Sequence, residues 1–465
     1  MTSADPRPTV RTVRRLLEQS IEEAVEEAED ALERPPETKA LVEATRPEGT
    51  RHRVVVTGLG AMTALGESPD SFWNGLLEGR SGVGPMTLCD PTNYPCRVAA
   101  EVRTFDPRNY LDFKEARRMA RFTQFAVAAA SQAIEAAGLR LDAEDRDRAG
   151  VLLGNGNGGF PTIDAEMRTV LSRGGMKVSP LFFPMILPNM AAAQISLRFG
   201  LTGYSSTVTT ACAAATQAIG EAIELIRRGA QDVMIAGGAE AGISELGLAG
   251  FSVMRALATD NDDPARASRP FDLTRNGFVP AEGAGILVLE SLEHALAREA
   301  VILAEVTGYG ASADAYHLVA PAPDGKGASV AMGRAIADAG LRPSEISWVN
   351  AHATSTDLGD TAETNALKRT FGEAASQIPI SATKSMVGHA LGAAGGLEAV
   401  AAVLAIRDQR IHPTINLTTP DPDCDLDYVV EGAREVAVAH VLSNSFGFGG
   451  QNACLIFSRY ELVDQ

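Results

Sequence analysis

Cysteines are few in this sequence, and their spacing excludes the frameworks that cysteines commonly build. Only five occur among 465 residues, at positions 89, 96, 212, 424 and 454. An odd number of scattered cysteines does not make a disulfide framework, so we expect a reducing, cytoplasmic setting. The sequence also lacks the CxxC and HxxxH spacings that suggest zinc ligands, and we expect no metal site.

Positive charge and long apolar stretches are also scarce. Lysine and arginine number 41 against 59 aspartate and glutamate residues, which gives a formal net charge of -18. This charge argues against general affinity for nucleic acids or anionic membranes, so an acidic partner would need a local basic patch. No apolar stretch approaches the roughly 20 residues that span a bilayer, and we expect no membrane insertion. The N-terminus has neither the apolar core of a signal peptide nor the composition of a transit peptide.

The composition instead favours a large α/β enzyme. Hydrophobic residues make up 45% of the chain, and glycines number 44. Such a chain can bury the core of two domains or of a duplicated fold. Residues 1–50 differ from the rest, because apolar positions at helical spacing and many glutamates predict one amphipathic helical extension of unknown role.

From residue 51 onward, strand patterns alternate with helix patterns, which predicts βαβ units and largely parallel sheets. Two segments recur weakly in the same order. VTGLG at 56–60 resembles VTGYG at 306–310, and AIEAAGL at 133–139 resembles AIADAGL at 335–341. This internal repeat indicates that the chain contains two related halves.

Cys212 stands where a strand pattern gives way to a helix pattern. The β-branched run 207–210 precedes it, and Ile219, Ile223 and Ile226 follow at helical spacing. Backbone N–H groups and the helix dipole at such a junction can stabilise a thiolate. A free cysteine is nevertheless more often a small buried hydrophobe, so the assignment depends on its partners.

Three further residues supply those partners. His352 ends an apolar, strand-like run, and Lys384 and His389 lie at the start of an alanine- and glycine-rich helix pattern over residues 390–405. A thiol, two imidazoles and an ammonium group at the edges of regular elements predict an acyl-transfer site.

Together with further motifs, these residues resemble the β-ketoacyl-acyl carrier protein synthases, the elongating type II condensing enzymes. The further motifs are VVVTGLG at 54–60, RPFD at 269–272, EGAG at 282–285 and NSFGFGG at 444–450. The resemblance runs from about residue 53 to residue 457. It implies a thiolase-like, five-layered αβαβα fold made of two duplicated halves, with the active site between them. The halves would span residues 51–305 and 306–465.

The resemblance implies a decarboxylative Claisen condensation of an acyl-acyl carrier protein with malonyl-acyl carrier protein in fatty acid elongation. Cys212 would accept the acyl group, and the backbone N–H groups of Cys212 and Phe448 would bind the thioester oxygen. His352 and His389 would donate hydrogen bonds to the malonyl thioester oxygen during decarboxylation. No cofactor is expected beyond the phosphopantetheine that the carrier itself bears.

The remaining site residues also follow from the resemblance. Lys384 would organise the two histidines, with Glu363 as its acidic partner. Thr354 and Thr356 match threonines that bind the phosphopantetheine arm, although capping of the next helix competes as an explanation. Phe448, between two glycines, matches an aromatic gate. Further substrate contacts are expected at Asn157, Phe251 and Phe446.

Basic side chains would recognise the acidic carrier protein. The matching positions are Lys114, Arg117, Arg118 and Arg255. Lys114 and Arg118 share a face if their segment is helical, although a solvated surface explains such residues equally well. A homodimer is also expected from the resemblance.

Three other functions compete with this interpretation. The segment GNGNGG at 154–159 fits the GxGxxG pattern of dinucleotide-binding dehydrogenases, but it lies far from the first βαβ unit and Pro161 disturbs the helix start after it. A non-catalytic chain-length partner of a polyketide synthase would lack a cysteine at the position of Cys212. An active ketosynthase of a type II polyketide or other specialised pathway would use the same chemistry.

Three positions depart from the usual pattern of the family. Ala353 replaces a common glycine, and Gln451 replaces a common threonine. Asn157 stands where elongating enzymes often place an apolar residue that lines the acyl pocket. These departures bear on acyl-chain preference rather than on the reaction type.

Overall fold

The computed structural model describes residues 51–461. Residues 1–50, where the sequence predicts a helical extension, and residues 462–465 lie outside the described residues. Between residues 51 and 461, no helix combines the length and the apolar character needed to cross a membrane.

Ten strands of the described chain form one sheet, in the order β10-β9-β13-β14-β8-β1-β7-β6-β4-β5. These strands are β1 (Val54–Met62), β4 (Ala149–Gly154), β5 (Ser205–Val208), β6 (Val233–Glu240), β7 (Gly283–Ser291), β8 (Ala304–Ala313), β9 (Trp348–Asn350), β10 (Ile380–Ser381), β13 (His440–Gly447) and β14 (Gln451–Ser458). Two small sheets are formed by β2 (Gly84–Pro85) with β3 (Val98–Ala99), and by β11 (Arg410–Ile411) with β12 (Arg434–Glu435).

The large sheet consists of two halves with the same topology. In the first half, β1 is antiparallel to β7, β7 is antiparallel to β6, and β6, β4 and β5 are parallel neighbours. In the second half, β8, β14, β13, β9 and β10 repeat these pairings in the same order. A short antiparallel contact between β1 and β8 joins the halves. The second half begins with β8 at Ala304, close to the predicted boundary between residues 305 and 306.

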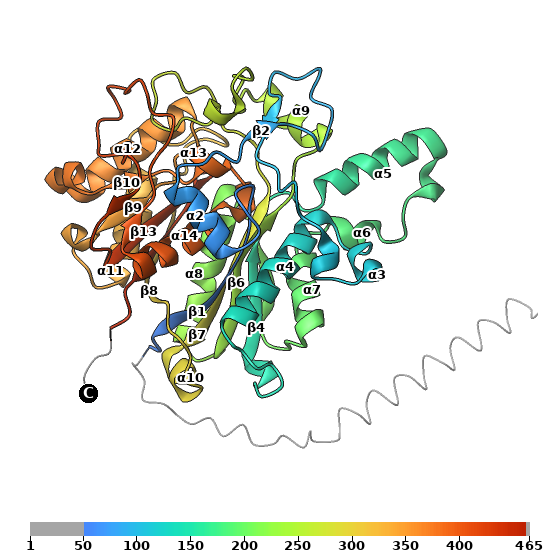
Figure 1. The fold of residues 1–465 in the computed structure, drawn as a ribbon, viewed down its shortest axis with the longest axis horizontal. Helices are drawn as coiled ribbons and strands as arrows, with labels where there is room; N and C mark the ends of the chain where they lie inside the picture. The colour runs from blue at the N-terminus through green and yellow to red at the C-terminus, as the bar shows by residue number, and fades with distance from the viewer. Residues whose placement is uncertain (1–50, 462–465) are drawn as a thin grey trace, which may run out of the picture. The chain divides into compact units, whose positions relative to one another are not determined.

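Helices cover these strands on their outer faces and separate the two halves. On the outside, α4 (Arg121–Ala136) packs on β1 and β7, and α11 (Lys326–Asp338) packs on β8 and β14. Between the halves, α8 (Ala214–Arg227) and α14 (Ala394–Asp408) contact each other and strands of both halves. Figure 1 shows α8 and α14 in the interior of the fold. This arrangement confirms the thiolase-like fold with duplicated halves.

The other α-helices surround this framework. They are α2 (Pro69–Leu77), α3 (Phe113–Ala116), α5 (Phe160–Arg173), α6 (Phe182–Ile186), α7 (Met190–Phe199), α9 (Glu245–Val253), α10 (Leu292–Ala297), α12 (Asp357–Phe371) and α13 (Lys384–Val387). Most of them pack on the sheet or on the loops around it. By contrast, α5 and α6 contain no buried residue, and α5 projects from the rest of the fold in Figure 1.

The weak sequence repeat has a physical cause in how closely helices approach strands. A Cβ atom on Gly60 of β1 would lie 1.9 Å from the Ala129 carbonyl oxygen of α4. At the equivalent place in the second half, a Cβ atom on Gly310 of β8 would lie 2.2 Å from the Ala331 carbonyl oxygen of α11. Only glycine fits where a helix backbone packs this tightly on a strand, so both halves retain glycine there.

Candidate active site

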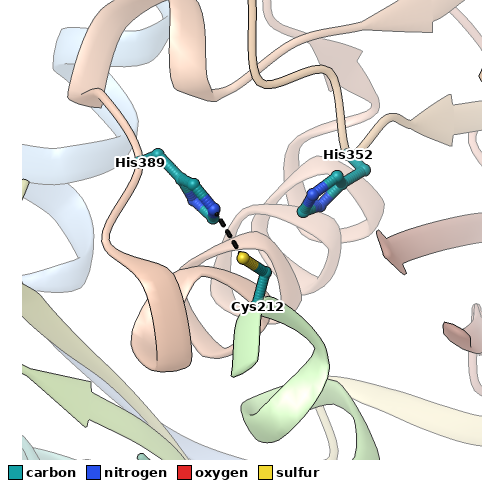
Figure 2. A group of neighbouring side chains, drawn as sticks. All are labelled: Cys212, His352 and His389. Atoms are coloured by element: carbon teal, nitrogen blue, oxygen red, sulfur yellow. Dashed lines mark hydrogen bonds between the residues drawn. The ribbon is translucent and has the colours of Figure 1, made fainter. Parts of the chain in front are cut away.

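Cys212, His352 and His389 come together from three separate segments of the chain (Figure 2). Cys212 lies in the 3₁₀ helix η4 (Ala211–Ala213) that leads into α8. His352 follows β9, and His389 lies between α13 and the 3₁₀ helix η8 (Leu391–Ala393) that leads into α14. The Nε2 atom of His389 lies 2.9 Å from the Cys212 sulfur, and the two imidazole centroids are 5.5 Å apart. The predicted cluster is therefore present in the structure.

The turn that presents Cys212 has an unusual backbone. Ala211, immediately before it, has a φ of 50°, in a region that residues other than glycine seldom adopt. Such backbone strain is found preferentially at functional sites. The turn aims the thiol between the histidines, and the Phe448 backbone N–H donates a hydrogen bond toward the thiol sulfur.

The predicted thiolate at Cys212 is not supported by its surroundings. Burial raises the pKa of the Cys212 thiol to about 12, against the opposing effects of the Lys384 ammonium and the Phe448 N–H. Desolvation disfavours the charged form more strongly than these groups favour it. The helix junction was visible in the sequence, whereas the depth at which Cys212 is buried was not. Because the pKa of the thiol is raised, the thiol needs a base, and His389 is within hydrogen-bonding distance of it.

Both histidines are held in the neutral form. Burial lowers the pKa of His352 and His389 well below the usual value of 6.5, and the positive charge of Lys384 lowers both further. A neutral imidazole has one nitrogen that donates a hydrogen bond and one that accepts. Each histidine can therefore donate to a developing negative charge without itself being charged.

The acidic partner of Lys384 differs from the predicted one. Its ammonium forms a buried ion pair with Glu398 of α14, not with Glu363. Glu363 of α12 instead accepts hydrogen bonds from the backbone N–H groups of His352 and Ala353, at 2.8 and 2.7 Å. It thus positions the His352 loop through the backbone. The sequence did hold a signal for Glu398, since it is the only charged residue between His389 and Arg407 in an otherwise alanine- and glycine-rich segment.

A cavity of about 580 Å³ opens onto the three reactive side chains. Thr354 and Thr356 line it, and their hydroxyl groups lie 2.9 Å apart. Thr356 occupies the N-cap position of α12, but its side chain makes no capping hydrogen bond. The capping explanation therefore fails for Thr356.

Aromatic residues surround the histidines. Phe446 and Phe448 line the cavity, and the Phe446 ring centroid is 5.7 Å from that of His352. Phe251 is not in the cavity lining. It packs against Phe278, whose ring is in turn 5.3 Å from the His389 ring. Sequence reasoning missed Phe278, because no motif singles out this phenylalanine.

The glycine loop after β4 is already occupied by a protein side chain. The backbone N–H groups of Gly156 and Asn157 donate to the buried carboxylate of Glu240. In a dinucleotide-binding fold such N–H groups would face a pyrophosphate. Pro161 was wrongly expected to disturb the following helix, since α5 begins at Phe160 and tolerates proline in its first turn. Asn157 is absent from the lining of the cavity beside Cys212, and its buried Nδ2 atom has no hydrogen-bond partner.

The expected docking residues are exposed, but they do not lie on one long helix. Lys114 belongs to α3, which ends at Ala116, so the shared face predicted with Arg118 is limited to a single helical turn. Arg117 caps that turn, and its guanidinium lies over the Phe113 ring. Arg255 follows α9 and lines the mouth of the reactive cavity.

The donor atoms of Cys212, His352 and His389 lie within 4.8 Å of one another and could also hold a metal ion. The Lys384 ammonium is close enough to lower the pKa of all three groups. Its positive charge would oppose a second cation at the same place. The geometry therefore favours covalent acyl chemistry over metal binding.

Comparison with known proteins agrees with this geometry. The sequence matches the family profiles described as "Beta-ketoacyl synthase, N-terminal domain" over residues 51–295 and "Beta-ketoacyl synthase, C-terminal domain" over residues 303–418. It is 49% identical over 411 residues to the 3-oxoacyl-[acyl-carrier-protein] synthase 2 of Synechocystis, which covers 88% of this chain and 99% of the relative.

Solved structures add two similar proteins. The ishigamide ketosynthase/chain length factor has a TM-score of 0.83 at 38% identity and covers 88% of this chain and 100% of its own. A type II polyketide acyl-carrier protein in complex with its ketosynthase bound to the hexaketide contains a chain with a TM-score of 0.80 at 35% identity, with the same coverage of 88% and 100%.

Proposed function

The chain belongs to the β-ketoacyl synthase family. On this basis we propose the role of each active-site residue in a decarboxylative condensation. The enzyme forms a carbon-carbon bond between an acyl group and a malonyl-derived unit in fatty acid elongation. The observation that carries the assignment of roles is the contact between His389 Nε2 and the Cys212 sulfur at 2.9 Å.

In the first step, Cys212 takes the acyl group from its carrier. His389 Nε2 accepts the thiol proton as the sulfur attacks the thioester carbonyl, which overcomes the raised pKa of the buried thiol. The carbonyl oxygen becomes negatively charged and is stabilised by the backbone N–H groups of Cys212 and Phe448. The proton then passes to the departing carrier thiolate, so that His389 is neutral again.

In the second step, the malonyl thioester loses carbon dioxide and becomes a carbon nucleophile. His352 donates a hydrogen bond to the thioester oxygen, where negative charge develops. His389 donates a second one in the tautomer that carries its proton on Nε2 instead of Nδ1. The nucleophile attacks the acyl carbon on Cys212, and the sulfur leaves and takes up a proton. The products are a β-ketoacyl thioester, carbon dioxide and the free enzyme thiol.

An acyl carrier protein is the partner that delivers both substrates. A similar ketosynthase has been captured with its carrier protein. On this chain the basic side chains would meet the acidic carrier, and Arg255 stands at the cavity mouth. Thr354 and Thr356 would bind the phosphopantetheine arm inside the cavity. No cofactor beyond that arm is required by the steps above.

A cytoplasmic homodimer is the expected assembly. Among the described strands, β5 is an edge of the large sheet and offers unpaired backbone groups, and the helices α5 and α6 contain no buried residue. Exposed apolar side chains include Leu171 of α5, Met176 of the 3₁₀ helix η3 (Gly175–Lys177) and Phe183 of α6. An exposed strand edge and exposed apolar side chains each favour pairing with a second copy.

Polyketide synthesis is the alternative pathway for the same reaction. The structurally similar chain from the type II polyketide complex is 35% identical, against 49% for the fatty acid relative. The presence of Cys212 beside both histidines argues against a non-catalytic chain-length partner.

The decisive experiment follows acylation of the protein by carrier-bound donors of several lengths, with malonyl carrier added to obtain products. Peptide mapping by mass should place the acyl group on Cys212, and Cys212→Ala should fold normally but form no β-ketoacyl product. Cys89→Ala is the matched control, because Cys89 is only partly buried and lies outside the site. Label on Cys89 or Cys454 in the parent protein would overturn the assignment.

A further inference from the structure

Glu240 is a buried carboxylate that none of the reaction steps uses. It ends β6 and is fully buried, and no positively charged side chain of residues 51–461 forms an ion pair with it. Its Oε2 atom accepts hydrogen bonds from the backbone N–H groups of Gly156 and Gly392, at 2.8 and 3.2 Å. Its Oε1 atom accepts a hydrogen bond from the Asn157 N–H at 3.3 Å. Three backbone donors from two segments therefore surround one carboxylate.

Gly392 occupies, in the second half of the fold, the position that Cys212 occupies in the first. Each is the middle residue of a three-residue 3₁₀ helix that leads into a central helix, η4 into α8 and η8 into α14. The residues immediately before them, Ala211 and Leu391, share left-handed φ values of 50° and 46°. The η8 turn is thus a second copy of the turn that presents the nucleophile.

The two strand ends that face these turns differ in one respect. Gly447 ends β13 and approaches the η4 turn, where a Cβ atom on Gly447 would lie 3.3 Å from the Cys212 nitrogen. Glu240 ends β6 and approaches the η8 turn, where its carboxylate binds the Gly392 nitrogen. The strand end beside Cys212 is a glycine without a side chain, whereas the carboxyl group of Glu240 occupies the equivalent place beside Gly392.

The contacts around Glu240 leave no spare room. A Cβ atom on Gly392 would lie 2.4 Å from the Gly156 nitrogen and 2.8 Å from Glu240 Oε2. A Cβ atom on Gly156 would also lie 2.8 Å from Oε2. The carboxylate therefore links the glycine loop after β4 directly to the turn that begins three residues before Gly392 with His389.

We propose that Glu240 is a positioning residue, whose carboxylate fixes the turn from His389 to Gly392 against the glycine loop and thereby holds His389 Nε2 beside the Cys212 sulfur. The inference rests on the proposed roles of Cys212 and His389. Glu240 itself touches neither the substrate nor the reacting atoms.

Loss of the carboxylate should displace His389 more than it disturbs the fold. In Glu240→Gln, an amide NH₂ group replaces one acceptor oxygen and faces a backbone N–H, so at least one of the three hydrogen bonds is lost. Gly392→Ala places a methyl group at Oε2 and should have the same effect by a different route. A misplacement approaching 1 Å reduces turnover by roughly 10- to 100-fold.

The test compares these two variants with matched controls. Glu290→Gln changes another fully buried carboxylate, which pairs with Val233 at the opposite end of β6. Gly333→Ala adds a methyl group in α11 where no atom lies within 4 Å. The measurements are kcat and KM for condensation, the alkylation rate of Cys212 by iodoacetamide as a function of pH, and the free energy of unfolding.

We expect both test variants to lower kcat with KM for the acyl carrier nearly unchanged. Gly392→Ala keeps the Glu240 charge and should shift the alkylation profile of Cys212 to higher pH. In Glu240→Gln that shift is opposed, because the Glu240 charge itself raises the pKa of Cys212. When Glu240→Gln and Gly392→Ala are combined, kcat should be no lower than in the more impaired single variant, because both substitutions disrupt the same contact. The controls should keep the kcat and the alkylation profile of the parent.

Parent-like alkylation in Gly392→Ala, or a kcat loss in Glu240→Gln no greater than in an equally destabilised Glu290→Gln, would refute the proposal. If the parent protein forms no β-ketoacyl product, the proposed function fails, while the alkylation profiles still decide whether Glu240 positions His389.

Discussion

Replacement of Lys384 by methionine should separate what the buried ammonium does for stability from what it does for catalysis. Lys384 and Glu398 are 2% and 1% exposed and form an ion pair. Methionine has a similar length but no charge, so the variant leaves the Glu398 carboxylate buried without a partner. Loss of one member of a buried pair typically costs about 3–5 kcal/mol. We expect a loss of this size in the free energy of unfolding, measured by urea denaturation.

The loss in the free energy of unfolding should depend on pH, and the direction is set by the titration of Glu398. Burial raises the pKa of Glu398 to about 7, and Lys384 opposes that effect. Without Lys384 this pKa rises further, so the folded state binds a proton that the unfolded state does not. Stability then falls as pH rises, and the variant should lose more at about pH 8 than at about pH 6.

A second substitution provides the control. In Lys384→Met with Glu398→Gln, both charges are absent, and most of the lost stability should return because no unpaired charge remains. The pH dependence of decarboxylation should not return to that of the parent, because Lys384 lowers the pKa of both histidines. Without Lys384 the histidines become protonated at a higher pH, so carbon dioxide release should begin to fall at a higher pH than in the parent. A single variant destabilised by less than about 1 kcal/mol, or a double variant as unstable as the single one, would refute this reasoning.

Three further predictions test the site from other directions. His352→Ala and His389→Ala should retain some acylation of Cys212 but lose malonyl decarboxylation, because both histidines donate to the malonyl oxygen. Acylation should be slower in His389→Ala than in His352→Ala, because His389 also accepts the thiol proton; undiminished carbon dioxide release in both would contradict their roles. Charge reversal of Lys114, Arg117 and Arg255 to glutamate should weaken the use of carrier-bound substrates and spare small thioester mimics; an equal loss with both would indicate misfolding. Asn157→Ile removes a buried amide whose Nδ2 has no partner, at a cost of about 1–3 kcal/mol in the parent, and should shift acylation rates toward medium and long saturated chains; an unchanged chain-length profile would show that Asn157 does not face the acyl chain.

The sequence predicted the features that depend on local pattern. The helix junction at Cys212, the strand end before His352 and the duplicated halves are all visible as changes of hydrophobic period or as repeated glycines. The repeated glycines were readable because each marks a close helix-to-strand contact that permits no side chain.

Features that depend on long-range packing could not be predicted in the same way. Glu398 and Glu363 are both acidic residues of central or neighbouring helices, and only the folded structure shows which of them reaches Lys384. The pKa of Cys212 depends on how much water the surrounding loops exclude, which no local motif records. Glu240 was missed for the same reason, since its three donors come from segments more than 80 and 150 residues away.

Comparison of the two halves of the fold explains why the nucleophile is found on one of the two equivalent turns and not on both. Both halves build a strained turn before a central helix, and in both the backbone N–H groups of that turn can stabilise an anion. In the first half the turn holds Cys212, and the strand that faces it ends in Gly447, which brings no side chain to the turn. In the second half the turn holds Gly392, whose N–H donates to the Glu240 carboxylate. The second turn therefore binds a protein side chain, and under our proposal this contact holds His389 beside the nucleophile of the first turn.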